Sequence, residues 1–209
     1  MSERRIAAFD FDGTLTQRDT LLPFLVRACG ARRVAQATSR VAPLAARARL
    51  GRLQAEIHHR DAVKEALLAD LLRGRDAEWF AEEGRSYART LPGRLRPEMS
   101  DQVAWHRRHG HELVIVSASL RTYLEPFAAA EGFDHVIAVG LEVDGEGRLT
   151  GRLEGPNVRG REKVARLEAW LAGEQPALLW GYGNSSGDAE LLERAHVPVW
   201  VGRRSQRAG

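Results

Sequence analysis

Short apolar runs, several of them rich in β-branched residues, alternate with helical segments along the chain, and this alternation limits the possible folds most strongly. The runs lie at Ile6–Phe11, Leu113–Ser117, His135–Val139, Ala177–Tyr182 and Val197–Val201. Helical periodicity occupies the later intervals, over Arg121–Glu131, Arg161–Ala172 and Gly187–Ala195. Strands that alternate with helices predict right-handed βαβ units and a mostly parallel sheet.

The interval between the first two predicted strands is about a hundred residues, whereas a βαβ crossover needs only a dozen or so. It is rich in Ala, Leu and Arg, and it predicts helices at Leu21–Cys29, Arg32–Leu50, Asp61–Leu72, Asp76–Thr90 and Pro97–His109. We expect residues 18–92 to form a small helical domain inserted after the first strand. Later in the chain, the segment Leu141–Leu153, with Gly and Asp at its centre, predicts a β-hairpin.

Composition excludes several classes of protein. Of the 209 residues, 44% are hydrophobic and one is cysteine, which excludes a disordered chain and a disulfide scaffold. No run of about 20 apolar residues predicts a membrane span. The net charge of +3 is small, and most arginines are interleaved with Ala and Leu, as on a solvated helix face. We expect a cytoplasmic protein with no nucleic-acid or membrane partner; monomer and homodimer both remain open.

Acidic residues follow the first predicted strand, at the end where open α/β sheets bind ligands. Asp10 and Asp12 are two positions apart, and a chain that curls at Gly13 would bring both carboxylates together. Two carboxylates repel by about 4 kcal/mol at about 4 Å with an effective dielectric constant near 20, so a shared proton or a cation must offset them. The alternative is an ordinary turn between a strand and a loop, in which Asp is a capping residue.

Polar segments also follow or precede the later strands. Ser117 and Ser119 could bind an anion or cap a helix. The segment Gly181–Asp188 superficially suggests a dinucleotide fingerprint, but its third Gly is one place late and little chain follows it. Lys163 lies in the first turn of a predicted helix, a position that is usually exposed.

Taken together and in order, these segments resemble the motifs of the haloacid dehalogenase superfamily of phosphohydrolases, in its phosphoserine-phosphatase-like branch (subfamily IB). The four matching segments are Asp10–Thr16, Val114–Ser119, Lys163 within Gly160–Val164, and Gly183–Asp188. The resemblance implies a Rossmann-like, three-layer α/β/α core made of residues 1–17 and 93–209. It also implies a helical-bundle cap of the C1 type, residues 18–92, and a small β-hairpin.

The resemblance further implies a Mg²⁺-dependent phosphomonoester hydrolase that acts on a small phosphorylated metabolite. Asp10 would be the nucleophile, Asp12 the general acid and base, and Ser117 and Lys163 the phosphoryl-binding groups. Mg²⁺ would bind a set of oxygen donors from Asp10, the Asp12 carbonyl, Asn184 and Asp188. The residues expected to bind substrate are Gly13, Thr14, Asp19, Arg60, Lys64, Ala118, Ser119, Asn157 and Arg159.

Asn184 departs from this pattern, because family members usually carry Asp there. We expect weaker Mg²⁺ binding, and a catalytically impaired protein that binds phosphorylated ligands is one alternative. A phosphotransferase that uses the same aspartyl phosphate is another. Lys64, the one Lys of the predicted cap, also leaves open a phosphonate hydrolase that uses a Schiff base.

Two of the substrate-binding expectations have ordinary alternatives. Asp19 either binds a substrate amine or caps the helix that follows it. Arg60 and Lys64 share a helix face, and they either attract an anionic substrate tail or belong to a solvated surface.

Overall fold

A five-stranded, fully parallel sheet forms the centre of the computed structural model, which describes residues 4–50 and 55–202, with the backbone alone at 44–50 and 55–60. The strands are β1 (Arg5–Phe9), β2 (Glu112–Leu120), β3 (His135–Val139), β6 (Leu178–Gly183) and β7 (Val197–Trp200), in the order β3-β2-β1-β6-β7. The central strand β1 pairs with β2 and β6, and its residues Ile6–Phe9 are completely buried. The apolar runs of the sequence are therefore explained by burial on both faces of the sheet.

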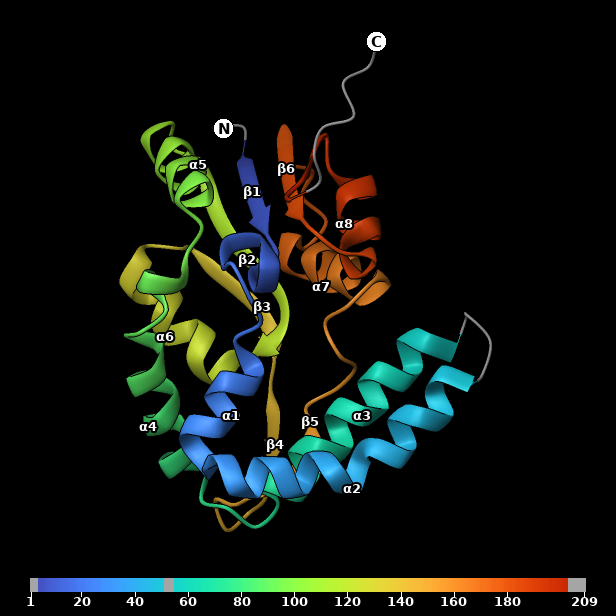
Figure 1. Cartoon of the computed structure of the whole chain (residues 1–209). Coiled ribbons are helices and arrows are strands. Elements are labelled where there is room, and N and C mark those ends of the chain that lie inside the picture. The colour runs from blue at the N-terminus through green and yellow to red at the C-terminus, as the bar shows by residue number, and fades with distance from the viewer. Residues whose placement is uncertain (1–3, 51–54, 203–209) are drawn as a thin grey trace.

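Helices cover both faces of this sheet (Figure 1). The helices α5 (Pro97–Arg108) and α6 (Arg121–Glu131) lie on one side, and α7 (Arg161–Leu171) and α8 (Ala189–Arg194) lie on the other. Right-handed crossovers that leave β1 in opposite directions place their helices on opposite faces. This arrangement confirms the Rossmann-like α/β/α core.

The strand order reverses between β1 and β6, and this position determines where the site lies. All five strands point the same way, so their carboxyl ends meet at one edge of the sheet. A crevice opens where neighbouring strands lead to opposite faces. Asp10 follows β1 and Asn184 follows β6 at that crevice.

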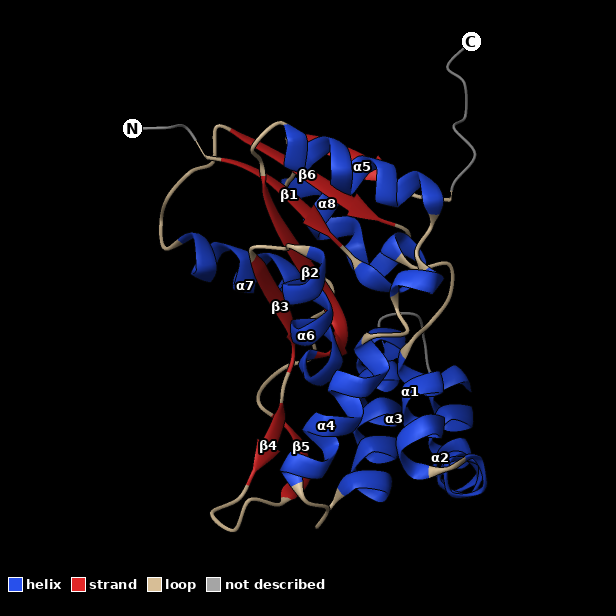
Figure 2. Cartoon of the chain, turned by 90° about the vertical axis from the view of Figure 1, so that its left-hand side faces the viewer, coloured by secondary structure: helices blue, strands red, loops and turns tan. Residues whose placement is uncertain are grey.

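Beyond this edge lie the remaining elements, as Figures 1 and 2 show. They are α1 (Leu21–Cys29), α2 (Ala31–Leu50), α3 (Ala55–Leu72), α4 (Ala77–Ala88), and the antiparallel hairpin of β4 (Leu141–Val143) and β5 (Leu149–Leu153). A 3-10 turn (Pro92–Arg94) lies between α4 and α5 in the chain. We call α1–α4 the helical insert. The hairpin packs on α3, where a Cβ on Gly151 would lie 2.8 Å from the Cα of Ala69. The domain division at residues 18–92 stays a prediction.

Several element boundaries differ from those predicted. Strand β2 continues through Leu120, which pairs with Val139 after an irregularity. Helix α8 begins at Ala189, because the preceding Ser186–Asp188 forms a 3-10 turn that Ser185 and Asp188 cap reciprocally. Helix α3 begins at Ala55, six residues before the predicted start.

Over the part of the chain that the structure describes, none of the helices combines the length and the apolar character needed to cross a membrane.

Candidate active site

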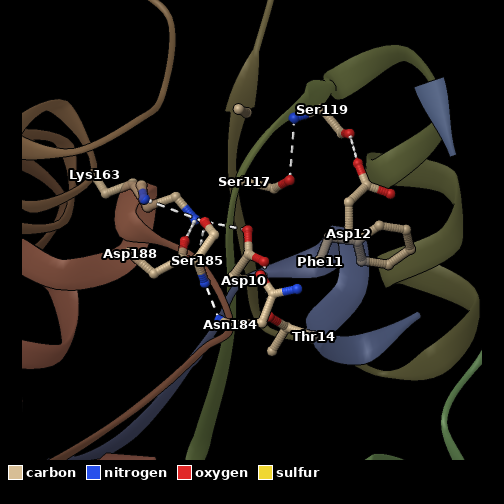
Figure 3. Close-up of polar contacts among 12 residues, drawn as sticks. Asp10, Phe11, Asp12, Thr14, Ser117, Ser119, Lys163, Asn184, Ser185 and Asp188 are labelled. Carbon is tan, nitrogen blue, oxygen red and sulfur yellow. Dashed lines mark hydrogen bonds and ion pairs between the residues drawn. The ribbon is translucent and has the colours of Figure 1, made fainter. Parts of the chain in front are cut away.

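The turn after β1 separates the two acidic residues of the first motif. The Asp10 backbone N–H donates to the Tyr182 carbonyl at 2.9 Å, which continues the pairing of β1 with β6. Gly13 then adopts a φ of +79°, and the turn closes when the Thr16 N–H donates to the Phe11 carbonyl at 2.9 Å. A left-handed φ favours Gly at this position. Because of this turn, the carboxylates of Asp10 and Asp12 point toward different partners (Figure 3).

A buried ammonium joins two carboxylates at the end of β1. The Lys163 Nζ donates to Asp10 Oδ1 at 2.7 Å and to Asp188 Oδ1 at 2.6 Å. Asp10, Lys163 and Asp188 are 7%, 2% and 1% exposed. Lys163 is therefore a buried residue and not a solvated surface residue. It is the cation that offsets the charge of Asp10.

The three ionisable groups of this cluster shift one another's pKa. Burial raises the pKa of Asp10 above its ordinary value, although Lys163 opposes the shift. Burial also acts to raise the pKa of Asp188, but Lys163 and the hydrogen bonds from Ser185 outweigh it, so that pKa is lowered. Burial acts to lower the pKa of Lys163, yet Asp10 and Asp188 raise it overall. The charges of the cluster therefore depend on one another.

Asp12 is held by groups from two different elements. Its Oδ1 accepts from the Thr20 N–H at 2.8 Å and from the Thr20 hydroxyl at 2.7 Å, and its Oδ2 accepts from the Ser119 hydroxyl. Burial raises the pKa of Asp12 to about 6, although the hydrogen bonds from Ser119 and Thr20 oppose the shift. Thr20 is in turn bound by Tyr87 and Tyr123. Asp12 is thus fixed by two hydroxyl groups and a backbone N–H rather than by a proton shared with Asp10.

Asn184 follows β6 and lies against the turn of the first motif. A Cβ on Gly13 would lie 2.1 Å from Asn184 Nδ2, so the side chain occupies the space that Gly13 leaves. Figure 3 shows the amide beside Asp10 and Thr14. Its backbone N–H donates to Asp188 Oδ2 at 3.1 Å.

The oxygen donors here match the preference of Mg²⁺. The Asp10 carboxylate, the Asn184 amide oxygen and the backbone carbonyl of Asp12 are hard ligands. The cluster at the end of β1 contains two carboxylates and one ammonium, so a cation is electrostatically favourable. Both oxygens of Asp188 already accept hydrogen bonds, from Lys163, Asn184 and Ser185. Asp188 therefore holds Lys163 and the loop in place.

A cavity of about 210 Å³ opens in front of these groups. It is lined by Asp10, Asp12, Asp19, Leu21, Asp61, Lys64, Ser117, Ala118, Ser119, Asn157, Arg159, Lys163, Ser185, Gly187 and Asp188. Within the described part of the structure, eleven of the fifteen residues that the sequence predicts for the site line this cavity. Gly13, Thr14 and Asn184 lie outside its lining, and the Thr14 hydroxyl donates to Asp10 Oδ2 at 2.8 Å.

The Ser117–Ser119 segment forms the wall opposite Lys163. The Ser119 N–H donates to the Ser117 hydroxyl oxygen at 3.0 Å, and both side chains are buried. Because β2 extends through this segment, the two serines belong to the strand end and do not cap α6.

The helical insert contributes Lys64 to the cavity. The Lys64 Nζ donates to the Ala118 carbonyl at 2.5 Å and to Asn157 Oδ1 at 2.7 Å, and Asn157 Nδ2 donates to Asp61 Oδ1 at 2.5 Å. Burial lowers the pKa of Lys64 to about 8, although Asp61 opposes the shift. Asp61 is not among the residues predicted from the sequence, although its spacing of three from Lys64 places the two on one helix face.

Two other expected substrate-binding residues are Asp19, which precedes α1, and Arg60, which lies in α3. Asp19 lines the cavity and also caps α1, because its Oδ2 accepts from the Leu22 N–H at 3.0 Å. The side chain of Arg60 lies outside the described part of the structure.

Comparison with known proteins places these motifs in a family. The family model described as haloacid dehalogenase-like hydrolase matches residues 7–193. Protein CicA of Caulobacter vibrioides is 34% identical over 91% of this chain and 82% of its own length. The phosphoserine phosphatase of Halobacterium salinarum is 29% identical over 94% of this chain and 85% of its own.

Solved structures share the fold. A protein of unknown function from Bordetella pertussis is 30% identical, with a TM-score of 0.73 over 93% of this chain and 88% of its own. A phosphoserine phosphatase, solved as an analogue of its phospho-aspartyl intermediate, is 20% identical, with a TM-score of 0.59 over 93% and 84% of the two chains. The chain belongs to the haloacid dehalogenase-like hydrolase family, in its phosphoserine-phosphatase-like branch of phosphatase enzymes.

Proposed function

We propose that the protein is a Mg²⁺-dependent phosphomonoester hydrolase that acts through a phosphorylated Asp10 on a small phosphorylated metabolite. The observation that carries the proposal is the buried contact of Lys163 with both Asp10 and Asp188, all three of which line the cavity. A carboxylate can approach a phosphate dianion only where cations cancel the repulsion. The cavity of about 210 Å³ suits a small substrate. The cytoplasmic location expected from the sequence stays a prediction.

In the first step, an Asp10 carboxylate oxygen attacks phosphorus. The bond between phosphorus and the ester oxygen breaks, and Asp12 gives its proton to the leaving alkoxide. Lys163 and the Ser117 hydroxyl bind the non-bridging oxygens. Lys163 already contacts Asp10 at 2.7 Å, so the same ammonium neutralises the nucleophile and the incoming group.

In the second step, water attacks the phosphorus of the acyl phosphate, and Asp12 accepts the proton. The bond between phosphorus and the Asp10 oxygen breaks, which releases inorganic phosphate and restores the carboxylate. Thr20 and Ser119 hold Asp12 in place through both steps.

Asp10, the carbonyl of Asp12 and Asn184 would hold the metal ion, and Asp188 would reach it only through water. The ion supplies positive charge to the phosphoryl oxygens. Asn184 contributes an oxygen but no charge.

The proposal is tested by phosphate release from a panel of phosphorylated metabolites at saturating Mg²⁺. The wild type and Asp101→Asn, an exposed acid on α5, are expected to be active, and Asp10→Asn is expected to be inactive. Substantial turnover by Asp10→Asn would remove its role as the nucleophile. Binding of a phosphorylated ligand without turnover by the wild type would instead support the impaired binding protein.

Transfer to an added alcohol would indicate a phosphotransferase. Mass spectrometry of the products, with glycerol as the acceptor, separates glycerol phosphate from inorganic phosphate. Hydrolysis predicts inorganic phosphate even at high glycerol.

The second candidate function is that of a phosphonate hydrolase, because Lys64 lies in the cavity and the pKa of Lys64 is lowered to about 8. A Schiff base with a phosphonate that bears a carbonyl group would be trapped by borohydride reduction. Absence of the adduct removes this candidate.

A further inference from the structure

Arg159 differs from the other two cations of the cavity wall. The Nε atom of Arg159 is buried and has no hydrogen-bond partner. Its guanidinium forms no ion pair with any residue that the structure describes. Lys163 is committed to Asp10 and Asp188. Lys64 is committed to Ala118 and Asn157. Among the residues that the structure describes (4–50 and 55–202), Arg159 is therefore the cation of the cavity lining whose N–H donors remain available to a ligand.

The fold holds Arg159 against the loop that carries the fourth motif. A Cβ on Gly187 would lie 3.0 Å from the Cγ, Cζ and Nε atoms of Arg159, so the side chain passes directly over that Gly. The Gly160 N–H donates to the Gly187 carbonyl at 2.9 Å, which ties the two segments together. Asp188, the next residue, contacts Lys163. Arg159 thus lines the same cavity as the cluster at the end of β1.

The charge of the cavity makes a free guanidinium important. Five carboxylates and three cations line the wall, so the lining alone is unfavourable for a phosphate dianion. A guanidinium presents several donors in a planar fork that matches carboxylate and phosphate oxygens. A buried donor without a partner costs free energy that such a ligand would recover.

We propose that Arg159 is an anion-binding residue of this cavity, which receives anionic oxygens of the phosphorylated substrate. The nature of the ligand rests on the proposed function, whereas the binding of an anion does not require turnover. Two parts of a substrate carry this chemistry: the phosphoryl group itself and a second anionic group such as a carboxylate.

The test is titration calorimetry on the Asp10→Asn protein, so that no probe is turned over. The probes are inorganic phosphate, ethyl phosphate and 2-phosphoglycolate, and the last two differ mainly by a carboxylate. Arg159→Gln is added to this background, and Arg161→Gln, an exposed arginine two residues away, is the matched control. Thermal denaturation checks that both variants remain folded.

Loss of Arg159 is expected to raise Kd by about tenfold or more, and Arg159→Lys is expected to restore part of the affinity. An equal loss for all three probes assigns Arg159 to the phosphoryl group. A loss confined to 2-phosphoglycolate assigns it to a second anionic group. Unchanged affinity for every probe, the same loss in Arg161→Gln, or no binding of any probe before Arg159 is replaced would overturn the proposal.

Discussion

Asn184 is the residue at which this chain departs from the family pattern, and the structure shows what the departure changes. The amide keeps the position beside Gly13 and Asp10, so one oxygen donor for a metal ion is retained. Compared with the Asp of the family pattern, the Asn184 amide lacks one negative charge. Asp188 does not replace that charge directly, because both of its oxygens accept hydrogen bonds.

Replacing Asn184 with Asp is expected to lower the Mg²⁺ concentration for half-maximal activity by about tenfold. The added carboxylate attracts the cation more strongly than a neutral amide does. The measurement is phosphate release against Mg²⁺ concentration, with Ser186→Asp, an exposed position two residues on, as a control for charge alone. An unchanged Mg²⁺ requirement would show that Asn184 does not contact the metal ion.

At the scale of elements, the docking of α4 on α6 depends on Gly84. A Cβ at this position would lie 2.4 Å from the backbone oxygen of Thr122. The two helices can approach this closely because Gly has no side chain. The same contact fixes Tyr87 and Tyr123, which flank Thr20 beside the site.

Gly84→Ala is therefore expected to lower the free energy of unfolding by about 1–3 kcal/mol, because backbone atoms must move apart. Urea denaturation measures the change. Gly93→Ala is the control, since a Cβ there meets nothing within 4 Å. Equal stability of both variants would contradict this account of the helix contact.

The strands, the helices and the cluster at the end of β1 could be predicted from sequence patterns for a physical reason. Parallel strands end at one edge of a sheet, so residues after β1, β2 and β6 must meet there. The position of Lys163 near the start of α7 adds the cation.

The contacts of the insert were not predictable, because periodicity identifies the buried face of a helix but not its partner. The chain from Asp61 through Asn157 to Lys64 joins residues nearly a hundred positions apart. Likewise, no spacing indicates that Arg159 lacks a partner.

At the scale of the whole molecule, the core contains a buried pair of histidines, His106 of α5 and His111, packed against side chains of β1 and β6. His106 Nδ1 lies 2.8 Å from His111 Nδ1, and its Nε2 lies 2.8 Å from the Tyr182 hydroxyl. Burial, together with His111, lowers the pKa of His106 to about 4. The network is satisfied when both rings are neutral, with one nitrogen donating and the other accepting.

Stability is consequently expected to fall as the pH decreases from 7 to 5. An unfolded chain protonates this imidazole near its ordinary pKa of about 6.5, whereas the folded chain resists protonation down to about 4. The unfolded state therefore binds more protons in this range, and the linkage amounts to about 2 kcal/mol. Urea denaturation at both pH values measures it. His106→Gln is expected to reduce the difference, and an equal pH dependence in that variant would contradict the assignment.

In the proposed reaction, Asp10 carries the phosphoryl group during turnover. The most direct measurement is acid quenching of excess enzyme with a phosphomonoester substrate and Mg²⁺, followed by mass spectrometry of the peptide that contains Asp10. One phosphoryl group is expected on Asp10 at early times; it should disappear as phosphate is released and be absent from Asp10→Asn. Phosphate release with no phosphorylated Asp10 at any time, or phosphorylation of another residue, would contradict this role of Asp10.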